Sequence, residues 1–253
     1  MPSRCRVRHH FALVAALYAL SISPARAGHP MLTEDTGTQG TGNLELEFGQ
    51  SWTRDGDDRV FLFQPQLSYG ITPTLDLIAQ PSWLSVDADA RGTVRGFGDS
   101  NLDAKWRFYG AAPLSLGVRA GLTLATSSRG LGQPHGSVEP HALMVATLDV
   151  APFTIDGNLG WQRAAPMPGA RHALMHASIA ANYSASEHMI LLLDADIDSN
   201  PQRADGKAPA VLLAGAIYTT SFGLDLDVGY RARLNAAAVA REWLLGLTYR
   251  WAP

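Results

Sequence analysis

The sequence has one cysteine in 253 residues, Cys5, and it lies close to the start of the chain. The residues around it have the layout of a signal peptide, so we expect cleavage after Ala27 to remove this cysteine. The mature chain would then have no disulfide, no thiolate nucleophile and no cysteine metal ligand. About 226 residues are enough to form a stable domain without disulfide bonds.

Export is predicted from three features of the first 27 residues. Arginines open the chain, an apolar run follows at residues 11–22, and a small-x-small cleavage site ends at Ala27. The apolar run is too short to cross a bilayer as a helix. We therefore predict a cleaved signal peptide at residues 1–27 and a mature start at Gly28, with a buried amphipathic helix as the alternative.

Long apolar runs are absent from the rest of the chain, and the mean hydropathy is −0.02. No stretch after the signal approaches the 18 apolar residues of a transmembrane helix, which excludes a helical membrane protein. A membrane barrel is not excluded, because polar residues that face its lumen interrupt every strand.

An excess of positive charge is also absent. The chain has 20 Lys and Arg residues against 23 Asp and Glu, and four of the arginines lie in the signal peptide. The mature chain therefore has 16 basic against 23 acidic residues, a net charge of about −7. This balance argues against nucleic acid as a partner and against an anion-selective pore.

What the mature sequence does contain is a repeated two-residue alternation. In residues 101–109, for example, leucine, alanine, tryptophan and phenylalanine alternate with aspartate, lysine and arginine. Successive side chains of a strand point to opposite faces, so each such segment is a strand with one apolar and one polar face. We predict twelve strands, give or take two: residues 43–52, 60–69, 75–86, 101–109, 114–124, 139–148, 153–161, 171–183, 189–198, 210–219, 224–231 and 241–251.

The spacing of these strands predicts an all-β, antiparallel, up-and-down barrel in an outer membrane. Strands of nine to eleven residues cross an apolar layer when tilted, and short turns alternate with longer polar segments, as in bacterial barrels. An even strand number then places both termini in the periplasm. We assign residues 28–42 to a periplasmic leader and residues 43–253 to the barrel. Pro81 weakens one strand, because it lacks a ladder donor.

Tryptophans mark the ends of the predicted strands, where a membrane barrel has its two interfacial girdles. The alternative, a soluble core, would place them in mid-strand. The six girdle residues are Trp52, Trp83, Trp106, Trp161, Trp243 and Trp251.

The charged face must then line the lumen, because a basic residue at mid-bilayer on the lipid face costs about 2–4 kcal/mol. Many of these charges are expected to pair across strands and brace the interior, and neighbouring glycines such as Gly229 leave space or allow curvature. The predicted lumen residues are Glu45, Glu47, Asp103, Lys105, Arg107, Arg119, Asp156, Asp194, Asp196, Asp225, Asp227, Arg231 and Arg233.

Recognisable catalytic and metal-binding motifs are missing. No Gly-x-Ser-x-Gly elbow occurs. His172 and His176 lie roughly 13 Å apart if both are in a strand, too far to chelate alone. The acidic stripe that begins at Asp194 lacks the glycine and distal glutamate of a calcium loop. We assign no catalytic residue, metal or cofactor.

Two stretches carry a resemblance to a known family. Residues 29–40 (HPMLTEDTGTQG) and 96–108 (GFGDSNLDAKWRF) resemble the opening and an internal part of an outer-membrane transporter-like barrel family named after the MetA pathway of phenol degradation. The resemblance implies a porin-like barrel in the outer membrane of a Gram-negative bacterium that passes small compounds, aromatic or hydrophobic ones among them. It assigns no catalytic residues.

We therefore predict a channel for facilitated diffusion, with outer-membrane lipid, the barrel-assembly machinery and a small solute as partners. The segments 87–98 and 127–137 are candidate gates, and replacing Arg119 or Asp103 with Ala should alter conductance or ion selectivity. The alternatives are a lipid-modifying barrel enzyme, a structural or sensing barrel with a plugged lumen, and a soluble periplasmic β-protein. The transported compound and the oligomeric state stay open.

Overall fold

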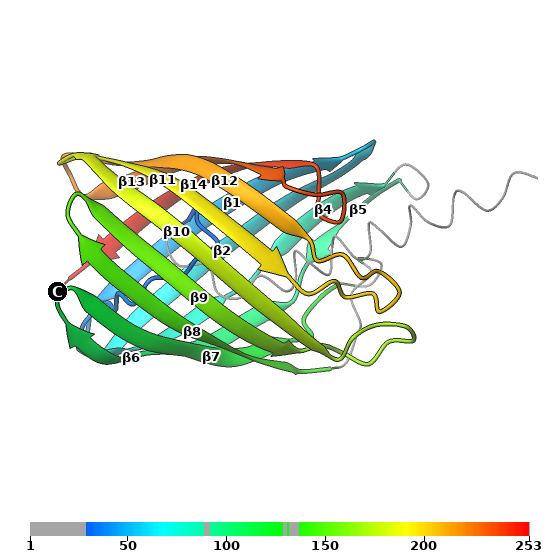
Figure 1. Cartoon of the computed structure of the whole chain (residues 1–253), viewed down its shortest axis with the longest axis horizontal. Coiled ribbons are helices and arrows are strands. Elements are labelled where there is room, and N and C mark those ends of the chain that lie inside the picture. The colour runs from blue at the N-terminus through cyan, green and yellow to red at the C-terminus, as the bar shows by residue number, and fades with distance from the viewer. Residues whose placement is uncertain (1–28, 89–91, 129–130, 132–136, 253) are drawn as a thin grey trace, which may run out of the picture.

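The chain forms a closed barrel of antiparallel strands around one lumen (Figure 1). A computed structural model describes residues 29–88, 92–128, 131 and 137–252, and the predicted signal peptide lies outside these residues. The strands are β1 (Leu44–Asp55), β2 (Asp58–Thr72), β3 (Leu75–Gln80), β4 (Trp83–Ala88), β5 (Gly92–Phe97), β6 (Ser100–Ala111), β7 (Leu114–Leu124), β8 (Glu139–Val150), β9 (Phe153–Arg163), β10 (Ala173–Ser186), β11 (Met189–Asp198), β12 (Ala210–Thr219), β13 (Leu224–Arg233) and β14 (Arg241–Trp251).

These fourteen strands fill twelve positions in the wall, because two wall strands are interrupted. β3 and β4 both pair with β2, and their other neighbours, β6 and β5, are consecutive as well. The first interruption is at Pro81, which has no N–H to donate. At the second, the N–H of Gly98 donates to the Ser82 carbonyl at 3.0 Å and keeps the two broken strands joined.

The predicted twelve-strand antiparallel barrel is confirmed, with one correction near Pro81. Residues 75–86 form two strands instead of one, and the segment 87–98, predicted as a loop, contains β5. Its glycines, aspartate and arginine resemble loop composition, yet β5 and β4 extend as a hairpin at one end of the barrel (Figure 1). Backbone hydrogen bonds with β4 hold β5 in a strand conformation, so the sequence of β5 need not alternate between apolar and polar residues.

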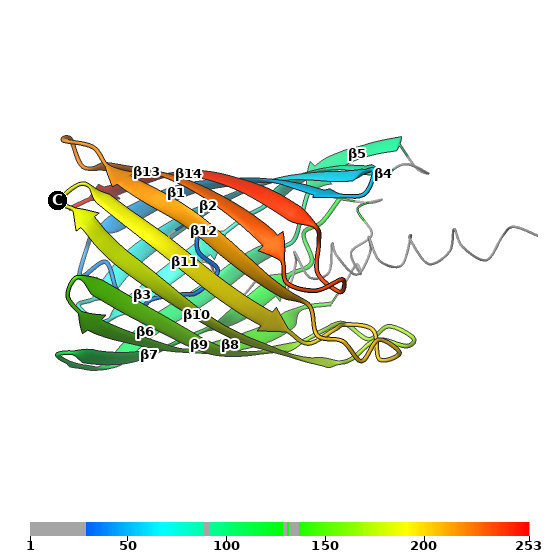
Figure 2. The ribbon, with the colours of Figure 1, turned by 45° about the horizontal axis from the view of Figure 1, so that its top comes forward.

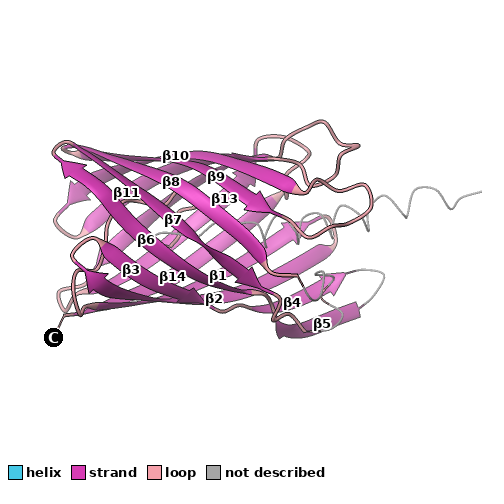
Figure 3. Ribbon diagram, turned by 90° about the horizontal axis from the view of Figure 1, so that it is seen from below, coloured by secondary structure: helices cyan, strands magenta, loops and turns pink. Residues whose placement is uncertain are grey.

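Pairing of the first strand with the last closes the sheet. β1 is hydrogen-bonded to β14 on one side and β2 on the other, with Trp52 opposite Trp243. Closure pairs β1 and β14 on both sides, and among the described strands β5 is paired on one side only, with β4. Figure 3 shows strands and loops only, and no helix among the described residues is long and apolar enough to cross a membrane.

The two ends of the barrel differ. Short turns at residues 73–74, 112–113, 151–152 and 187–188 gather at the end where the chain terminates, which we name the turn end. Longer connections at residues 164–172, 199–209 and 234–240 gather at the opposite end, which we name the loop end (Figure 1). This is the short–long rhythm that the sequence predicts, except that β1 and β2 are joined at the loop end by a short turn at residues 56–57.

Burial is inverted relative to a soluble protein. Leu159 and Leu193 are 66% and 54% exposed on the outer face, whereas Arg119 and Glu242 have no exposed surface on the inner face. A single-layer wall with apolar residues outside and polar residues inside requires an apolar surrounding, such as the hydrocarbon layer of a membrane.

Candidate functional site

The lumen wall carries the charged residues that the sequence assigns to it, with two exceptions. All are buried on the inner face except Arg107 and Arg233. Arg107 is next to a bulge in β6 at the turn end and donates to the Pro73 carbonyl at 3.2 Å. Arg233 ends β13 at the loop end, where its side chain is 45% exposed and 3.7 Å from Asp55. Both arginines lie at the rims of the barrel.

The tryptophans lie towards the two ends of the outer face. At the loop end, the rings of Trp52 and Phe61 are 5.3 Å apart, and Phe61 is 6.1 Å from the half-buried Trp83. At the turn end, Trp106 and Trp251 are about half exposed. Trp161 and Trp243 are likewise exposed.

The N-terminal residues run inside the barrel (Figure 2, blue). The sequence assigns them to a leader ahead of the barrel, but the described part, residues 29–42, contacts wall strands from β1 around to β14. Thr33 is fully buried and Glu34 is 1% exposed. We name residues 29–42 the inner segment. No residue pattern predicts this position, because the segment has neither a strand nor a helix period.

Hydrogen bonds to wall side chains fix the middle of the inner segment. The Asp194 carboxylate accepts three hydrogen bonds, from the N–H groups of Leu32 at 2.6 Å and Thr33 at 2.9 Å and from the Thr33 hydroxyl at 2.6 Å. Asn158 pairs with the backbone of Glu34 in both directions, at 2.7 and 2.8 Å. These contacts satisfy backbone groups that would otherwise be unpaired inside the barrel.

Ion pairs hold the same part of the segment to the opposite wall. Glu34 accepts from Lys105 Nζ at 2.6 Å and from Arg119 Nη1 at 2.7 Å. Lys105 also contacts Asp35 at 3.0 Å. Burial raises the pKa of Asp35, but the charge of Lys105 and hydrogen bonds from Lys105 and the Gly37 N–H outweigh it and hold that pKa below its ordinary value. Asp35 is therefore ionised at neutral pH.

Apolar contacts and wall glycines complete the fit. Met31 belongs to a buried cluster with Leu192, Leu213 and Leu244. At Gly70 an added Cβ would overlap the Gly40 carbonyl, so a side chain there excludes the segment's present path. Gly229, at which the sequence predicts free space or curvature, has Pro30 packed against it.

A chain of polar contacts crosses the lumen at the level of the inner segment. Arg119 on β7 binds Asp103 at 2.7 Å and reaches Gln66 on β2 at 3.2 Å. Gln66 donates to Glu47, which accepts the His29 N–H at 3.2 Å, and His29 Nδ1 is 2.5 Å from Asp227 on β13. Polar contacts thus link the side chains of β6, β7, β2, β1 and β13 to the inner segment at this level.

Acidic groups outnumber basic groups in this interior. The buried bases among the described residues are Lys105, Arg119 and Arg231. The buried acids are Glu34, Glu45, Glu47, Asp76, Asp103, Asp156, Asp194, Asp196, Asp225, Asp227 and Glu242.

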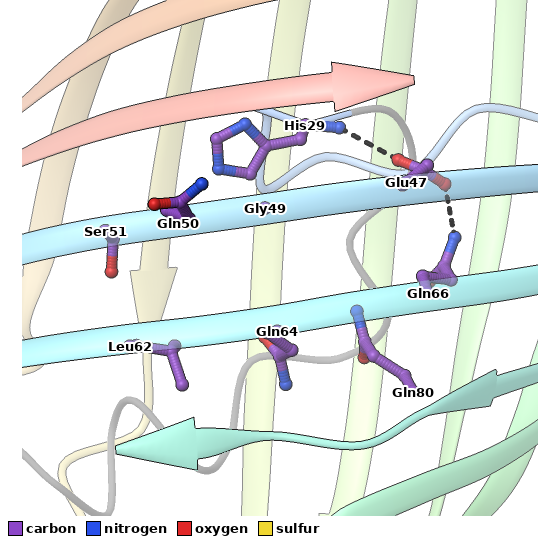
Figure 4. A pocket seen from close by; sticks show the side chains of 9 residues that line it. All are labelled: His29, Glu47, Gly49, Gln50, Ser51, Leu62, Gln64, Gln66 and Gln80. Carbon is purple, nitrogen blue, oxygen red and sulfur yellow. Dashed lines mark hydrogen bonds between the residues drawn. The ribbon is translucent and has the colours of Figure 1, made fainter. Parts of the chain in front are cut away.

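A pocket lies beside His29, between β1, β2 and β3 (Figure 4). Glutamines supply much of its lining, Gln64, Gln66 and Gln80 among them, and Ser51 and Leu62 lie farther along the same strands. No glutamine motif in the sequence marks this site, because its lining comes from three strands and from the inner segment.

The buried histidines among the described residues pair with carboxylates: His29 with Asp227, His176 with Asp198, and His141 with Asp103 at 2.7 Å. The Thr123 hydroxyl is 3.4 Å from the other ring nitrogen of His141. His29 Nε2 and Ser51 Oγ share the pocket, but neither has a hydrogen-bond partner there, so they form no acid–base pair. His172 precedes β10 and is exposed, while His176 is buried and 2.8 Å from Asp198. No cluster of three or more potential ligands has the geometry of a metal site in the part of the chain that is described.

The predicted gates are described only in part. Most of the segment 127–137 lies outside the described residues, although Leu131 is 2% exposed and packs with Val60, Leu62 and Leu84 inside the loop end. Residues 89–91 of the other predicted gate also lie outside the described residues.

A family model matches more than half of the chain. The model of the family described as "Putative MetA-pathway of phenol degradation" matches residues 81–251. The chain belongs to this family. The matched residues begin at Pro81, where the first wall strand is interrupted, and cover β4 to β14. The inner segment therefore lies outside the match. No curated protein sequence matches the chain.

Solved structures show the same fold. The COG4313 outer membrane channel from Pseudomonas putida F1 has a TM-score of 0.64 and 16% identity over 89% of this chain and 99% of that chain. The NanC porin has a TM-score of 0.59 and 8% identity over 81% and 98%. The CymD monoaromatic hydrocarbon channel has a TM-score of 0.53 and 10% identity over 85% and 90%. The shared fold and the apolar outer face together show that this chain is an outer-membrane barrel.

Proposed function

We propose that the protein is an outer-membrane channel for the passive passage of small uncharged compounds, aromatic or hydrophobic ones among them, and that the inner segment is its closed gate. One observation carries the proposal: a polar lumen is closed by residues of the same chain, held through a few ionic anchors such as Glu34 and Asp194. A gate of this kind can leave without breaking the wall, because it shares no strand pairing with it over residues 29–39.

The solute class follows from the lumen and from the relatives. The acidic surplus disfavours anions, and the charged groups along the crossing chain are mutually paired, so a charged solute would have to displace existing partners. The name of the family refers to phenol degradation, and CymD is named as a monoaromatic hydrocarbon channel. Both support an uncharged, partly apolar solute.

Orientation and partners belong to the same proposal. The short turns and both ends of the barrel sequence would face the periplasm, and the longer connections the exterior, as in bacterial outer-membrane barrels. Outer-membrane lipid would surround the apolar face, and the barrel-assembly machinery would insert the chain. The barrel has no catalytic role in this proposal, since the relatives named above are channels and porins.

Liposome swelling tests the channel and the gate together. The mature protein is compared with a variant in which residues 29–39 are replaced by a glycine–serine segment of equal length. We expect the replacement to accelerate the swelling caused by a small uncharged solute. The equal length keeps the distance to β1 unchanged, so a difference reports on the side chains of the inner segment.

The second candidate, a structural barrel with a plugged lumen, is favoured by the complete chain of polar contacts across the lumen. It predicts swelling for the replacement variant and none for the mature protein under any solute. If neither protein supports swelling, the channel proposal fails. If both swell equally fast, the inner segment is not the gate.

A further inference from the structure

Three arginines lie side by side on the outer face at the loop end of the barrel. In the strand register, Arg54 on β1 is opposite Arg241 on β14 and also opposite Arg59 on β2. All three are exposed, and we name them the arginine row. Directly opposed residues have their Cβ atoms about 4.5–5.5 Å apart, and like charges at that distance repel one another. The strand pairing alone therefore does not account for the row.

Aromatic side chains run parallel to the arginine row. Each arginine has an aromatic residue two positions away on the same strand and the same face, and these residues are Trp243, Trp52 and Phe61. They lie closer to the middle of the barrel than the arginines, and the rings of Trp52 and Phe61 are 5.3 Å apart. Aromatic residues at the strand ends of a membrane barrel lie among the lipid headgroups. The arginine row would therefore lie at the level of the headgroup phosphates.

No ion pair within the described part of the chain neutralises the arginine row. Asp87 on β4 follows Arg59 in the register, but no ion pair joins the two. Asp55 and Asp58 are opposite each other one position beyond the row, so strand alternation turns them to the inner side, where Asp55 is 3.7 Å from Arg233. The guanidinium groups of the row can therefore take an anion from outside the chain.

Guanidinium chemistry favours a phosphate as that anion. The planar group presents paired N–H donors that match two phosphate oxygens, and such charge-assisted pairs are the stronger hydrogen bonds. Nε of Arg54 donates to the Gly56 carbonyl at 3.3 Å, and no contact among the described residues occupies its terminal nitrogens. Phosphates between neighbouring arginines would also relieve their mutual repulsion.

The row has no counterpart at the turn end. Among the described residues, the basic residues near the strand ends there are Arg107 and Arg250, and both belong to the inner face. Arg250 is paired with Glu45 and Asp225. A phosphate-bearing partner of the outer face is thus expected on the loop-end side of the membrane only.

We propose that the arginine row binds the phosphate groups of lipid A, the bisphosphorylated glycolipid of the outer leaflet, and so holds the β14–β1–β2 side of the barrel in that leaflet. The inference rests on the proposed function for one element, the orientation that places the loop end outside. It does not depend on passage through the lumen, because the row is on the lipid face.

Three lipids test the ligand class: lipid A, dephosphorylated lipid A and phosphatidylglycerol. Each is titrated into the full mature barrel in an uncharged detergent, and bound lipid is counted by native mass spectrometry. We expect lipid A to bind at least tenfold more tightly than its dephosphorylated form. Equal affinity of these two would overturn phosphate recognition. Phosphatidylglycerol that binds as tightly as lipid A would overturn the choice of lipid A.

Single substitutions test the location. Arg54→Gln removes the middle charge of the row at an exposed position and lessens the repulsion there, so we expect the barrel to fold and to bind lipid A about fivefold more weakly. Arg163→Gln is the matched control. Arg163 is also exposed at the loop end and lies two residues from Trp161, but its partner in the register is Ala173. We expect R163Q to bind as the unaltered barrel does, and equal losses in R54Q and R163Q would remove the site.

A label in a loop separates the orientation from the lipid site. Gly206 is exposed in the connection 199–209, and an added Cβ meets nothing within 4 Å. A membrane-impermeant maleimide should label G206C in intact cells. Labelling only after the outer membrane is opened would overturn the orientation and the choice of lipid A together. If liposomes fail to swell, only the channel is refuted, and lipid A binding that R54Q weakens still supports the site.

Discussion

Glu34 is the residue at which the gate proposal can be tested most directly. It is 1% exposed and accepts hydrogen bonds from two cations of the wall, Lys105 at 2.6 Å and Arg119 at 2.7 Å. Glu34→Gln keeps the size and shape of the side chain and removes its charge. We expect this substitution to shift the inner segment towards the undocked state.

The magnitude follows from the partners that remain. Lys105 keeps Asp35 at 3.0 Å, and Arg119 keeps Asp103 at 2.7 Å, so neither cation is isolated. The cost is then below the 3–5 kcal/mol of stranding a buried charge. Because two hydrogen bonds lose their charged acceptor, the docked state of the inner segment is destabilised by about 2–3 kcal/mol. That is a rise of about 30- to 150-fold in the ratio of undocked to docked protein.

Cysteine labelling measures this ratio. Cys5 lies in the predicted signal peptide, so a cysteine placed at Thr36, which is 3% exposed, is the single label site in the mature chain. A water-soluble maleimide should react with the T36C/E34Q barrel about 30 to 150 times faster than with T36C alone, if docking is rapid relative to labelling.

Asp35→Asn is the matched control, because it removes a neighbouring charge whose side chain is 43% exposed. Partly exposed ion pairs contribute less than buried ones, so we expect D35N to accelerate labelling less than E34Q does. If E34Q is labelled no faster than D35N, the ionic anchor does not hold the segment and the reasoning fails.

Three further predictions concern the fit of the segment, the lipid face and the charge of the lumen. Gly70→Ala should undock the segment, because the new Cβ overlaps the Gly40 carbonyl, whereas Gly157→Ala meets nothing closer than 4.0 Å; equal labelling rates for the two would contradict this. Leu193→Arg, at a 54% exposed position in the middle of β11, should destabilise the barrel in lipid vesicles by about 2–4 kcal/mol, against about 0–1 kcal/mol for Ile197→Arg near the strand end, as measured by denaturant titration. The variant with residues 29–39 replaced by a glycine–serine segment should show cation preference in its reversal potential across a salt gradient. Anion preference would refute the argument that the acidic surplus of the lumen sets its selectivity.

The wall of the barrel could be predicted from the sequence because the side-chain pattern of each strand depends only on the residues of that strand. A strand between lipid and lumen must alternate apolar and polar side chains. In the segment 224–231, leucine and valine form one face and aspartate the other, so the sequence alone identifies both faces. The same rule places most lumen charges on the inner face. Arg107 and Arg233 keep this alternation, but they lie near the two rims and are therefore less buried than the other lumen charges.

The gate and the pocket could not be predicted in this way, because their contacts join residues far apart in the chain. Thr33 binds Asp194 across 161 positions, and His29 binds Asp227 across 198. The inner segment has turn-like composition and no period, so nothing local distinguishes it from a solvated leader. Gly229 is one signal in the wall: the sequence predicts space or curvature there, and Pro30 packs against it.

The wall charges separate into two groups once their partners are known, and this division links closure to selectivity. Arg231 with Glu242, and Arg250 with Glu45, pair wall to wall and would persist in an open barrel. The Asp194 carboxylate instead accepts its three hydrogen bonds from the inner segment, and Lys105 is bound by two carboxylates of that segment.

Departure of the segment would therefore expose more wall acid than base, since Asp76 and Asp227 lose segment partners as well. Water that fills an open lumen can solvate each of these groups, so the net cost of opening is far smaller than the summed strength of the hydrogen bonds and ion pairs that hold the segment. The same carboxylates that hold the gate when it is closed would then set the cation preference when it is open. Closure and charge selection thus depend on one set of residues, and a substitution such as Asp194→Asn should weaken both together.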